Sequence, residues 1–392
     1  MRVLINGAGI AGPTLAYWLH RLGHRPTLVE QAPKPRRGGY AVDFWGAGFD
    51  VAERMGIVPE LRARGYHFRE VRAVRREGSR IASFAPSTFV GSDGRYVTIA
   101  RSDLAAAVLA ALAGRVETLF DDTVDAIDDN GDRVRVTFRS GTRREFDLVV
   151  GADGLHSRVR KLAFGPEERF EHRLGIVVAA FEVEGYRLRD ELVAVMHADV
   201  GFQLLRLSLR EDVTMFCLTL RDHGDVRLDH PAEQQALLRR KLVHAGWEAP
   251  AILDAMAHAR TFYFDRVSQI RMPSWSTGRV ALVGDAAACP SLLAGQGSAL
   301  AMIEAYVLAA ELAATPDDHT AAFTRYHARL APLLRSKQDA AKGLGLAFAP
   351  RNRRQLVVRN TLLRLLGLPH IPNLVMGRSL RDAVELPAVP VG

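Results

Sequence analysis

The stretch that decides the fold stands near the start of the chain: Val3-Leu4-Ile5-Asn6-Gly7-Ala8-Gly9-Ile10-Ala11-Gly12. The apolar run 2–6 predicts a buried strand, and the apolar-rich segment 13–22 predicts a helix, so the glycines fall at the turn between them. Glycines let a backbone approach a pyrophosphate closely, and a helix N-terminus offers free N–H groups and a positive dipole end. The pattern therefore predicts a dinucleotide-binding turn.

A second strand is predicted at residues 27–29, and it ends in Glu30. An acidic residue roughly 20 positions after the glycine turn binds a ribose hydroxyl and disfavours a 2′-phosphate. Two alternatives stay open, namely a glycine turn that binds nothing and a signal peptide. Three glycines interrupt the apolar run and no small-residue cleavage site follows, which disfavours the signal peptide.

A second glycine motif, Gly151-Ala152-Asp153-Gly154, follows an apolar strand predicted at 146–150. Loops at the carboxyl ends of parallel strands bind ligands, so Asp153 could accept hydrogen bonds from ligand hydroxyls. Arg160 could meet a phosphate or a partner carboxylate with its guanidinium. The alternative is a plain Asp-Gly turn with solvated arginines.

A third motif follows the apolar strand predicted at 279–283. Gly284-Asp285 comes first, and Gly295-Gln296-Gly297 stands directly before a helix predicted at 298–314. The Asp285 carboxylate suits a ribityl hydroxyl, and the helix N-terminus would face the N1 and O2 edge of a flavin, where it stabilises the anion formed on reduction. A helix cap beside a buried aspartate is the alternative. Together the three motifs predict one domain that binds flavin adenine dinucleotide (FAD).

Length and composition agree with an enzyme of two lobes. The 392 residues exceed what one hydrophobic core usually serves, and 48% hydrophobic with 24% charged residues is typical of a soluble protein. Cys217 and Cys289 cannot form a disulfide framework, and no His/Cys spacing indicates a metal site. We therefore expect a cytoplasmic protein without bound metal.

The formal net charge of +8 does not by itself indicate a nucleic-acid partner. Lys and Arg are interleaved with Asp and Glu along most of the chain, and an anionic cofactor is a sufficient reason for a basic surface. The longest uncharged run, 286–303, contains Pro290 and the third glycine motif, so we expect no transmembrane segment.

Between residues 173 and 220 the pattern changes to four strand-like runs, which predicts an inserted, sheet-rich lobe. Phe202, Gln203 and Met215 lie on these runs and could line a substrate cavity, with core packing as the alternative. The predicted fold is α/β: a Rossmann-like FAD-binding domain (1–70, 97–170 and 275–345), a β-sheet-rich substrate domain (71–96 and 171–274) and a C-terminal helical tail (346–392). In the tail, 351–366 fits an amphipathic helix that lies on a membrane surface or packs across both lobes.

The segments GAGIAG, GADGLHSRVR and GRVALVGDAAACPSLLAGQG, with Glu30 between the first two, resemble the FAD-dependent class A aromatic hydroxylases of the para-hydroxybenzoate hydroxylase type. Over residues 1–340 the pattern is similar to monooxygenases that modify polyketides in secondary metabolism, including tetracycline-inactivating enzymes. The resemblance implies FAD as cofactor, NADPH or NADH as reductant, and capture of O₂ as a flavin hydroperoxide. It also implies hydroxylation of an aromatic or polyketide-like small molecule. We expect the protein to be a monomer or homodimer.

The resemblance further implies which residues hold the cofactor. Position by position, these are Gly7, Gly9, Ile10, Ala11, Gly12, Glu30, Arg36, Asp43, Arg101, Val124, Asp153, Gly154, Arg160, Gly284, Asp285, Gly295, Gln296 and Gly297. The first three glycines and Glu30 would hold the ADP half, and Arg101 the ribityl or phosphate region. Arg36 would serve NADPH unless its loop is merely basic and solvated, and Asp153 and Arg160 would serve FAD and NAD(P)H.

Departures from the family pattern fall close to the chemistry. The family usually has His at Ala288, Pro at Ser291, Asn at Ala299 and Asp at Glu304. We expect Pro290 to take the place of the family's proline beside the flavin, together with Gly295.

Other functions stay open. One is a flavin dehydrogenase or reductase that does not hydroxylate, and another is a catalytically silent flavin-binding protein. A halogenase is disfavoured because Trp247 and Trp275 do not form the WxWxIP signature. Cys289 lies beside the flavin loop, but a lone cysteine in an apolar run usually packs in a core.

Overall fold

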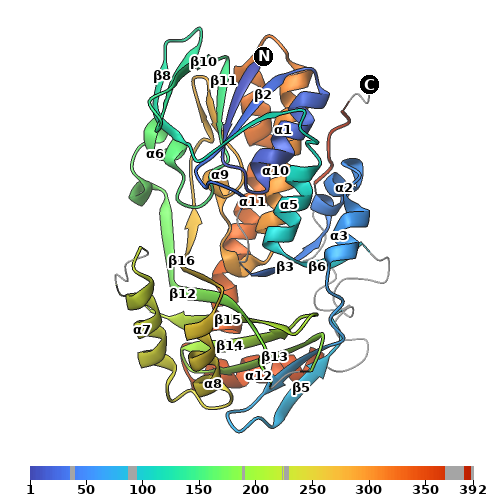
Figure 1. Cartoon of the computed structure of the whole chain (residues 1–392), viewed down its shortest axis with the longest axis vertical. Coiled ribbons are helices and arrows are strands. Elements are labelled where there is room, and N and C mark those ends of the chain that lie inside the picture. The colour runs from blue at the N-terminus through green and yellow to red at the C-terminus, as the bar shows by residue number, and fades with distance from the viewer. Residues whose placement is uncertain are drawn as a thin grey trace.

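The chain folds into two lobes joined by a long helix (Figure 1). The computed structural model describes residues 1–35, 40–86, 95–187, 190–222, 224, 229–366 and 384–389. One lobe is built on a six-stranded sheet with strand order β17-β18-β11-β1-β2-β7, and the other on a seven-stranded sheet with order β16-β12-β15-β14-β13-β4-β5.

The six-stranded sheet is mostly parallel. Its strands are β1 (Arg2–Asn6), β2 (Arg25–Glu30), β7 (Glu117–Phe120), β11 (Leu148–Gly151), β17 (Ser276–Thr277) and β18 (Val280–Leu282). β1 pairs in parallel with both β2 and β11, and β11 pairs in parallel with β18. The strands that precede the three glycine motifs are therefore neighbours, and their carboxyl ends meet at one edge of the sheet.

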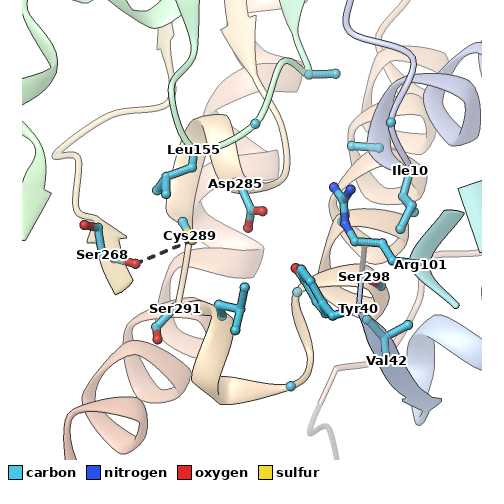
Figure 2. A pocket seen from close by; sticks show the side chains of 18 of the residues that line it. Ile10, Tyr40, Val42, Arg101, Leu155, Ser268, Asp285, Cys289, Ser291 and Ser298 are labelled. Carbon is cyan, nitrogen blue, oxygen red and sulfur yellow. Dashed lines mark hydrogen bonds between the residues drawn. The ribbon is translucent and has the colours of Figure 1, made fainter. Parts of the chain in front are cut away.

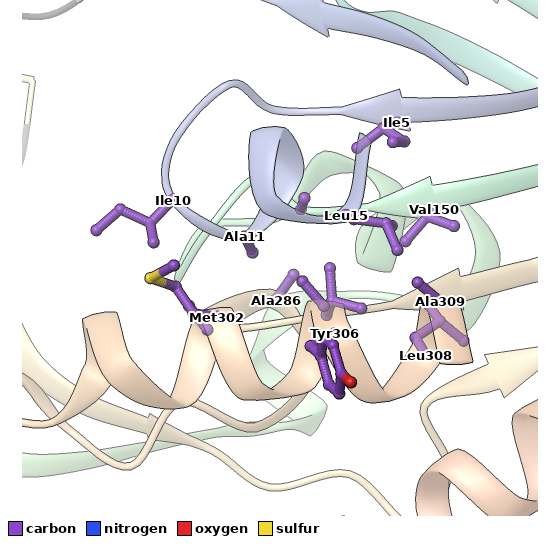
Figure 3. Packing of buried hydrophobic residues seen from close by; sticks show 14 of the residues in the cluster. Ile5, Ile10, Ala11, Leu15, Val150, Ala286, Met302, Tyr306, Leu308 and Ala309 are labelled. Atoms are coloured by element: carbon purple, nitrogen blue, oxygen red, sulfur yellow. The ribbon is translucent and has the colours of Figure 1, made fainter. Parts of the chain in front are cut away.

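The core of this lobe explains why β1 is an uninterrupted apolar run. Val3, Leu4 and Ile5 are fully buried, as expected for a parallel strand covered on both faces. Helices α1 (Ala11–Arg21) and α10 (Gly297–Ala314) pack against each other in this core, which Figure 3 shows from close by. By length and composition α10 could cross a membrane, but 83% of it is buried inside the protein, which marks it as the central core helix.

Shorter elements surround this sheet. They are β3 (Ala41–Trp45), β6 (Tyr96–Ala100), β8 (Val124–Asp129), β9 (Val134–Phe138), β10 (Arg143–Phe146), α2 (Ala47–Arg54), α3 (Val58–Arg64), α5 (Arg101–Ala110), α6 (Arg158–Phe164), α9 (Asp285–Ala288) and the short 3₁₀ turns η1 (Glu167–Arg169) and η3 (Leu292–Ala294). β3 pairs antiparallel with β6, and β8, β9 and β10 form a separate three-stranded sheet.

The seven-stranded sheet forms the second lobe. Its strands are β4 (Glu70–Val74), β5 (Arg80–Phe84), β12 (Glu171–Glu184), β13 (Val193–Asp199), β14 (Phe202–Ser208), β15 (Val213–Arg221) and β16 (Thr261–Ile270). Helices α7 (Pro231–Leu242) and α8 (Ala249–Ala255), followed by the turn η2 (Met256–His258), form an apolar core with one face of this sheet. On the other face, Ile176, Val178 and Val267 pack against Leu293 of the third glycine motif, so this face turns toward the first lobe.

Two helices complete the chain. The 30-residue helix α11 (His319–Phe348) runs from the first lobe to the second sheet (Figure 1), where the carbonyl of Phe348 accepts a 2.9 Å hydrogen bond from Thr219 Oγ1. After it, α12 (Arg353–Leu366) packs against β5, β13 and the end of α11.

The predicted α/β fold class is confirmed, and the four strand-like runs between 173 and 220 are β12 to β15. One detail differs. The amphipathic tail helix forms, but α11 is the helix that spans the two lobes, and α12 packs against β5, β13 and the end of α11.

We predict that Gly12→Ala destabilises the fold, since its Cβ would lie 1.9 Å from the carbonyl oxygen of Gly7, a backbone atom of the turn. Overpacking of this kind costs about 1–3 kcal/mol. Urea denaturation of the cofactor-free protein measures it. Gly9→Ala is the matched control, because its Cβ would meet nothing within 4 Å. Equal stability of the two variants would contradict the packing described here.

Candidate cofactor and active site

Asn6, the last residue of β1, ties the first two glycine motifs together. Its Nδ2 donates to Asp153 Oδ2 (3.0 Å), and its Oδ1 accepts from Thr123 Oγ1 (3.1 Å) and from the N–H of Val124 (3.2 Å). Its backbone carbonyl accepts from the N–H of Ala152 at 2.8 Å. Because both ends of this buried amide are satisfied, the two loops hold a fixed relative position.

The two outer glycines of the first turn are required by the protein, whereas the middle one leaves open space. Gly7 has φ +114°, and a Cβ there would lie 2.5 Å from the carbonyl oxygen of Ala152. Gly12 packs directly under Gly7. Gly9 faces nothing within 4 Å, so the absence of a side chain there serves something outside the chain. That space lies at the N-terminus of α1, where first-turn N–H groups lack helical partners and attract an anion.

Glu30 reaches into the same space from the end of β2. Its carboxylate accepts hydrogen bonds from the N–H groups of Ala8 and Ala32, both at 2.9 Å. These two bonds fix the carboxylate and leave further lone pairs toward the cavity. A ribose hydroxyl is the kind of donor that this arrangement would bind.

Two adjoining cavities follow the carboxyl edge of the sheet. The first extends from Glu30 and Phe120 past the glycine turn, and the second reaches Ser291 and the third glycine motif. They share Gly9, Tyr40, Arg101, Ala152, Gly154, Leu155, Tyr263 and Asp285. The shared walls make one elongated trough, which fits an extended dinucleotide.

Charged groups face each other in the middle of the trough. Figure 2 shows the Asp285 carboxylate and the Arg101 guanidinium directed into the cavity, with the Tyr40 ring beside them. Burial opposes the charge on Arg101, but neighbouring Tyr40 and Asp285 offset this, so the pKa of Arg101 lies above its ordinary value. A permanent cation and a carboxylate at this point suit the hydroxyl groups and phosphate of a ribityl phosphate chain.

The far end of the trough is the N-terminus of α10. Gly295, Gly297 and Ser298 line the cavity there, and Gly295 adopts a left-handed conformation with φ +66°. The 18-residue helix behind them places a positive dipole end and unpaired N–H groups at this point. Negative charge that develops on a ligand is stabilised here, and the residues present therefore fit FAD over its whole length.

The trough contains most of the cofactor residues expected from the sequence. Those that line it are Gly7, Gly9, Ile10, Ala11, Glu30, Arg101, Asp153, Gly154, Asp285, Gly295 and Gly297. Asp153 lines the cavity, yet its carboxylate already accepts from Asn6, Ser157 and the N–H groups of Arg158 and Val159. Its contact with cofactor stays a prediction, while its hydrogen bonds hold the second loop and α6 in place.

Gly12, Val124, Gly284 and Gln296 lie behind this lining. Gly12 and Val124 act through the turn contacts given above. Gly284, with φ +65°, aims Asp285 into the cavity, and Gln296 is the N-cap residue of α10. Arg36 lies outside the described residues.

Asp43 and Arg160 are placed differently from the expectation. Strand alternation in β3 turns Val42 toward the cavity and Asp43 to the opposite side, where its carboxylate accepts from Tyr96 Oη and Thr98 Oγ1. Arg160 is fully buried and donates to the carbonyls of Leu155 and Ala286 and to Glu167. Its guanidinium therefore braces the loop behind the cavity instead of meeting a phosphate.

The three substrate candidates pack in the second lobe. Gln203 Oε1 accepts a 2.6 Å hydrogen bond from Arg359, and the Phe202 ring lies edge-on to His197. Met215 is fully buried, with its sulfur 3.1 Å from the N–H of Ala41. All three therefore fit the core-packing alternative. Gln203 contacts Arg359 of α12, Phe202 contacts His197 of β13, and Met215 contacts Ala41 of β3, and none of the three lines the trough.

The loop after α9 also differs from the expectation. Ser291 and Leu292 line the cavity, whereas the carbonyl of Pro290 is bonded to Gln269 and its ring is not part of the lining. Ser291 has φ +117°, which a proline ring cannot adopt, so this loop holds a different backbone from one built around proline. Cys289 is buried, and burial followed by the nearby Asp285 raises the pKa of its thiol, which disfavours the reactive thiolate form.

Two tyrosines that sequence reasoning missed form the wall beside the third motif. The rings of Tyr40 and Tyr263 lie 5.7 Å apart between centroids and line the cavity. Tyr40 precedes β3 and Tyr263 lies on β16, so only the folded chain brings them together. Burial raises the pKa of Tyr40 to about 12, which keeps its phenol protonated.

A histidine joins the two lobes at the rim of the trough. His156, in the loop after β11, contacts Glu167 Oε1 at 2.9 Å through Nδ1 and Asp265 at 3.3 Å through Nε2. These hydrogen bonds to Asp265 and Glu167 raise the pKa of His156 to about 10. The resulting imidazolium fixes β16, and with it Tyr263, against the second glycine motif.

Behind Asp285 lies a buried carboxyl group that stays neutral. Glu304 of α10 accepts the N–H of Gly284 at 2.8 Å and lies 3.2 Å from Tyr326 Oη, which is also 3.1 Å from the carbonyl oxygen of Leu282. The single Tyr326 proton can serve only one of these acceptors. A protonated Glu304 that donates to the tyrosine oxygen satisfies both, and burial raises the pKa of Glu304 to about 8.

Known proteins are similar to this chain in sequence and in fold. The FAD binding domain family matches residues 1–335. The "Uncharacterized protein Rv1260" of Mycobacterium tuberculosis is 41% identical over 330 residues, which are 83% of this chain and 88% of that protein. A "Flavin-dependent monooxygenase" from an unknown prokaryotic organism is 33% identical over 395 residues, 98% of each chain.

Among solved structures, the tetracycline destructase Tet(55) matches with a TM-score of 0.85 at 31% identity, over 99% of this chain and 98% of that one. The chain belongs to the FAD binding domain family and is an FAD-dependent monooxygenase.

We predict that Gly9→Ala leaves the fold intact but weakens FAD binding by at least about tenfold, because its Cβ fills the space that a pyrophosphate needs. Calorimetric titration of cofactor-free protein with FAD measures the change. Its unfolding curve should overlay that of the wild type. An unchanged dissociation constant for FAD would show that the pyrophosphate does not pass over this turn.

We predict that Glu304→Gln flattens the pH dependence of stability. The folded protein keeps the Glu304 proton to about pH 8, whereas the ordinary pKa is 4.5, so the stability from this group is full below about pH 4.5 and is lost as the pH rises to about 8. Glutamine has the same length as the protonated Glu304 side chain and stays neutral at every pH. Relative to the wild type, the variant should gain stability on the order of a few kcal/mol above about pH 8.

Denaturant unfolding across this pH range measures the difference. Glu311→Gln on the same helix is the control: Glu311 is ion-paired with Arg325 and Arg329, so its loss should lower stability without flattening the curve. Parallel pH profiles for wild type and Glu304→Gln would contradict a neutral Glu304.

Proposed function

We propose that this monooxygenase consumes NADPH or NADH and hydroxylates a bulky aromatic or polyketide-like small molecule. The observation that carries the proposal is the chamber at the flavin end of the trough, where Tyr40 and Tyr263 face the third glycine motif beneath the second sheet. The solved relative at 31% identity is a tetracycline destructase, and tetracycline is a polycyclic substrate of this class. We expect the enzyme to act in the cytoplasm as a monomer or homodimer.

When bound, FAD supplies the redox chemistry: it takes a hydride from the reductant and activates O₂ for transfer of one oxygen atom. The chain's own residues orient and protect that chemistry. The N-terminus of α10 would stabilise negative charge on the flavin, and Arg101 and Asp285 would hold the ribityl chain and its phosphate. Val42, Leu155 and Leu292 give the cavity apolar walls that exclude water.

The two phenols would recognise the substrate. Burial raises the pKa of both Tyr40 and Tyr263, so both remain hydrogen-bond donors at neutral pH. A phenol or enol oxygen on the substrate can accept from Tyr40, and a substrate hydroxyl can donate to the Tyr263 oxygen, while the substrate ring stacks against both tyrosine rings. Tyr263 Oη donates a 3.2 Å hydrogen bond to Asp265 Oδ2, which fixes the orientation of the phenol.

The use of NADPH or NADH as reductant follows from the family resemblance. Arg160 is excluded as its ligand by burial, and Arg36 lies outside the described residues. The family resemblance carries this part, since class A hydroxylases reduce their flavin directly with NAD(P)H.

The test is steady-state oxidation of NADPH and NADH by FAD-loaded protein, with tetracycline, an anthraquinone and simple phenols as probes and with ¹⁸O₂ as oxidant. We expect one probe class to stimulate oxidation and to gain one ¹⁸O atom. Tyr263→Phe should raise KM for that probe by about tenfold with little effect on FAD binding. Reduction that no probe stimulates, with H₂O₂ as sole product, would overturn hydroxylation in favour of a non-hydroxylating flavin oxidoreductase. Bound FAD that neither nucleotide reduces would favour a silent flavin-binding protein.

A further inference from the structure

The outward face of α12 exposes a concentration of apolar side chains. Within the described residues, seven large hydrophobic side chains are exposed, and four of them are on this 14-residue helix. They are Val357 (63% exposed), Val358 (50%), Leu362 (47%) and Leu365 (40%). Single exposed hydrophobics are ordinary on a protein surface, but a cluster of this kind on one element marks an interaction site.

These side chains follow the helix geometry. Val358, Leu362 and Leu365 are spaced i, i+4 and i+7, which places them in one stripe along the helix. Arg359, which lies beside this stripe on the helix, is buried, and α12 packs on β5 and β13. The stripe therefore points away from the protein and is exposed to solvent.

Hydrogen bonds fix the rotation of α12 about its own axis, so the apolar stripe cannot turn toward the protein. Arg359 is 5% exposed and donates to the carbonyl of Ala347 (2.7 Å) and to Gln203 Oε1 (2.6 Å). Turning α12 would break both bonds and leave the buried guanidinium with fewer acceptors, which is costly. The hydrogen bonds of Arg359 therefore keep the apolar stripe in its exposed orientation.

The charge around the stripe has one sign. Residues 351–366 contain five arginines and no Asp or Glu, and Arg353, Arg354 and Arg364 are exposed. Within the described ranges, none of these three forms an ion pair. Residues 75–80, in the turn between β4 and the adjoining β5, add three exposed arginines against one glutamate.

We propose that this face of α12, defined by Val357, Val358, Leu362, Leu365, Arg353, Arg354 and Arg364, docks on a bilayer surface rich in anionic phospholipid. Apolar side chains beside arginines are what an interfacial helix needs, because the aliphatic groups enter the acyl boundary while the guanidiniums meet lipid phosphates. A nucleic acid would satisfy the arginines but leave the aliphatic stripe in water, which disfavours that partner. The inference is independent of the proposed substrate, and its test needs no turnover.

The experiment is co-sedimentation of the FAD-loaded full chain with phosphatidylcholine vesicles, with and without phosphatidylglycerol. We expect binding to the anionic vesicles that weakens as salt is raised, since screening shortens the reach of the arginines. The triple variant Val358→Ser, Leu362→Ser, Leu365→Ser should lose at least about tenfold in affinity, and so should Arg353→Gln, Arg354→Gln, Arg364→Gln.

The controls make the same kinds of change at exposed residues elsewhere, Val243→Ser on the second lobe and Arg143→Gln on the first, and should bind as the wild type does. All variants are checked for bound flavin and a wild-type unfolding curve. Failure of the wild type to sediment with anionic vesicles would overturn the proposal. So would a dimer in solution that the serine variant dissociates, because the stripe would then be covered by a second copy of the chain.

Discussion

The side-chain amide of Asn6 is the contact on which the site depends. β1 lies between β2 and β11, so its last residue is the point where the glycine turn, the second motif and β8 all approach one another. An amide can donate and accept at the same time, and Asn6 uses both abilities, to Asp153 on one side and to Thr123 and Val124 on the other. The two loops are thereby fixed before any cofactor is present, which reduces the ordering that binding would otherwise require.

A second constraint separates two carboxyl groups at the third motif. Asp285 stands at the cavity and faces Arg101, whereas Glu304 is buried one layer behind and keeps its proton. The neutral acid accepts the N–H of Gly284 and thus holds the residue that aims Asp285, without placing a second negative charge beside it. The family pattern has an aspartate at position 304, and an aspartate side chain is one methylene shorter than Glu304. This exchange therefore affects how the carboxyl group reaches the Gly284 backbone, and it does not change Asp285, which faces the cavity.

The sequence was sufficient for the parts of the fold that local patterns encode. Apolar runs before each glycine motif predicted the strands β1, β11 and β18, and the cluster of strand-like runs predicted the second sheet. Contacts between residues distant in the chain could not be predicted from local patterns, because they depend on the register between distant strands. Examples are the ring contact of Tyr40 with Tyr263, the hydrogen bonds of Arg160 and the hydrogen bond between His156 and Asp265. Asp43 shows the same limit, because a shift of one residue in an extended strand turns a side chain from the cavity to the opposite face.

The central claim is that loops distant in sequence hold one flavin dinucleotide along a single trough, and a crystal structure of the protein with FAD tests it most directly. The account predicts the adenosine ribose on Glu30, the pyrophosphate over Gly9, and the isoalloxazine between the N-terminus of α10 and the Tyr40–Tyr263 wall. A dinucleotide that contacts only the first loop, or lies outside the trough, would contradict it.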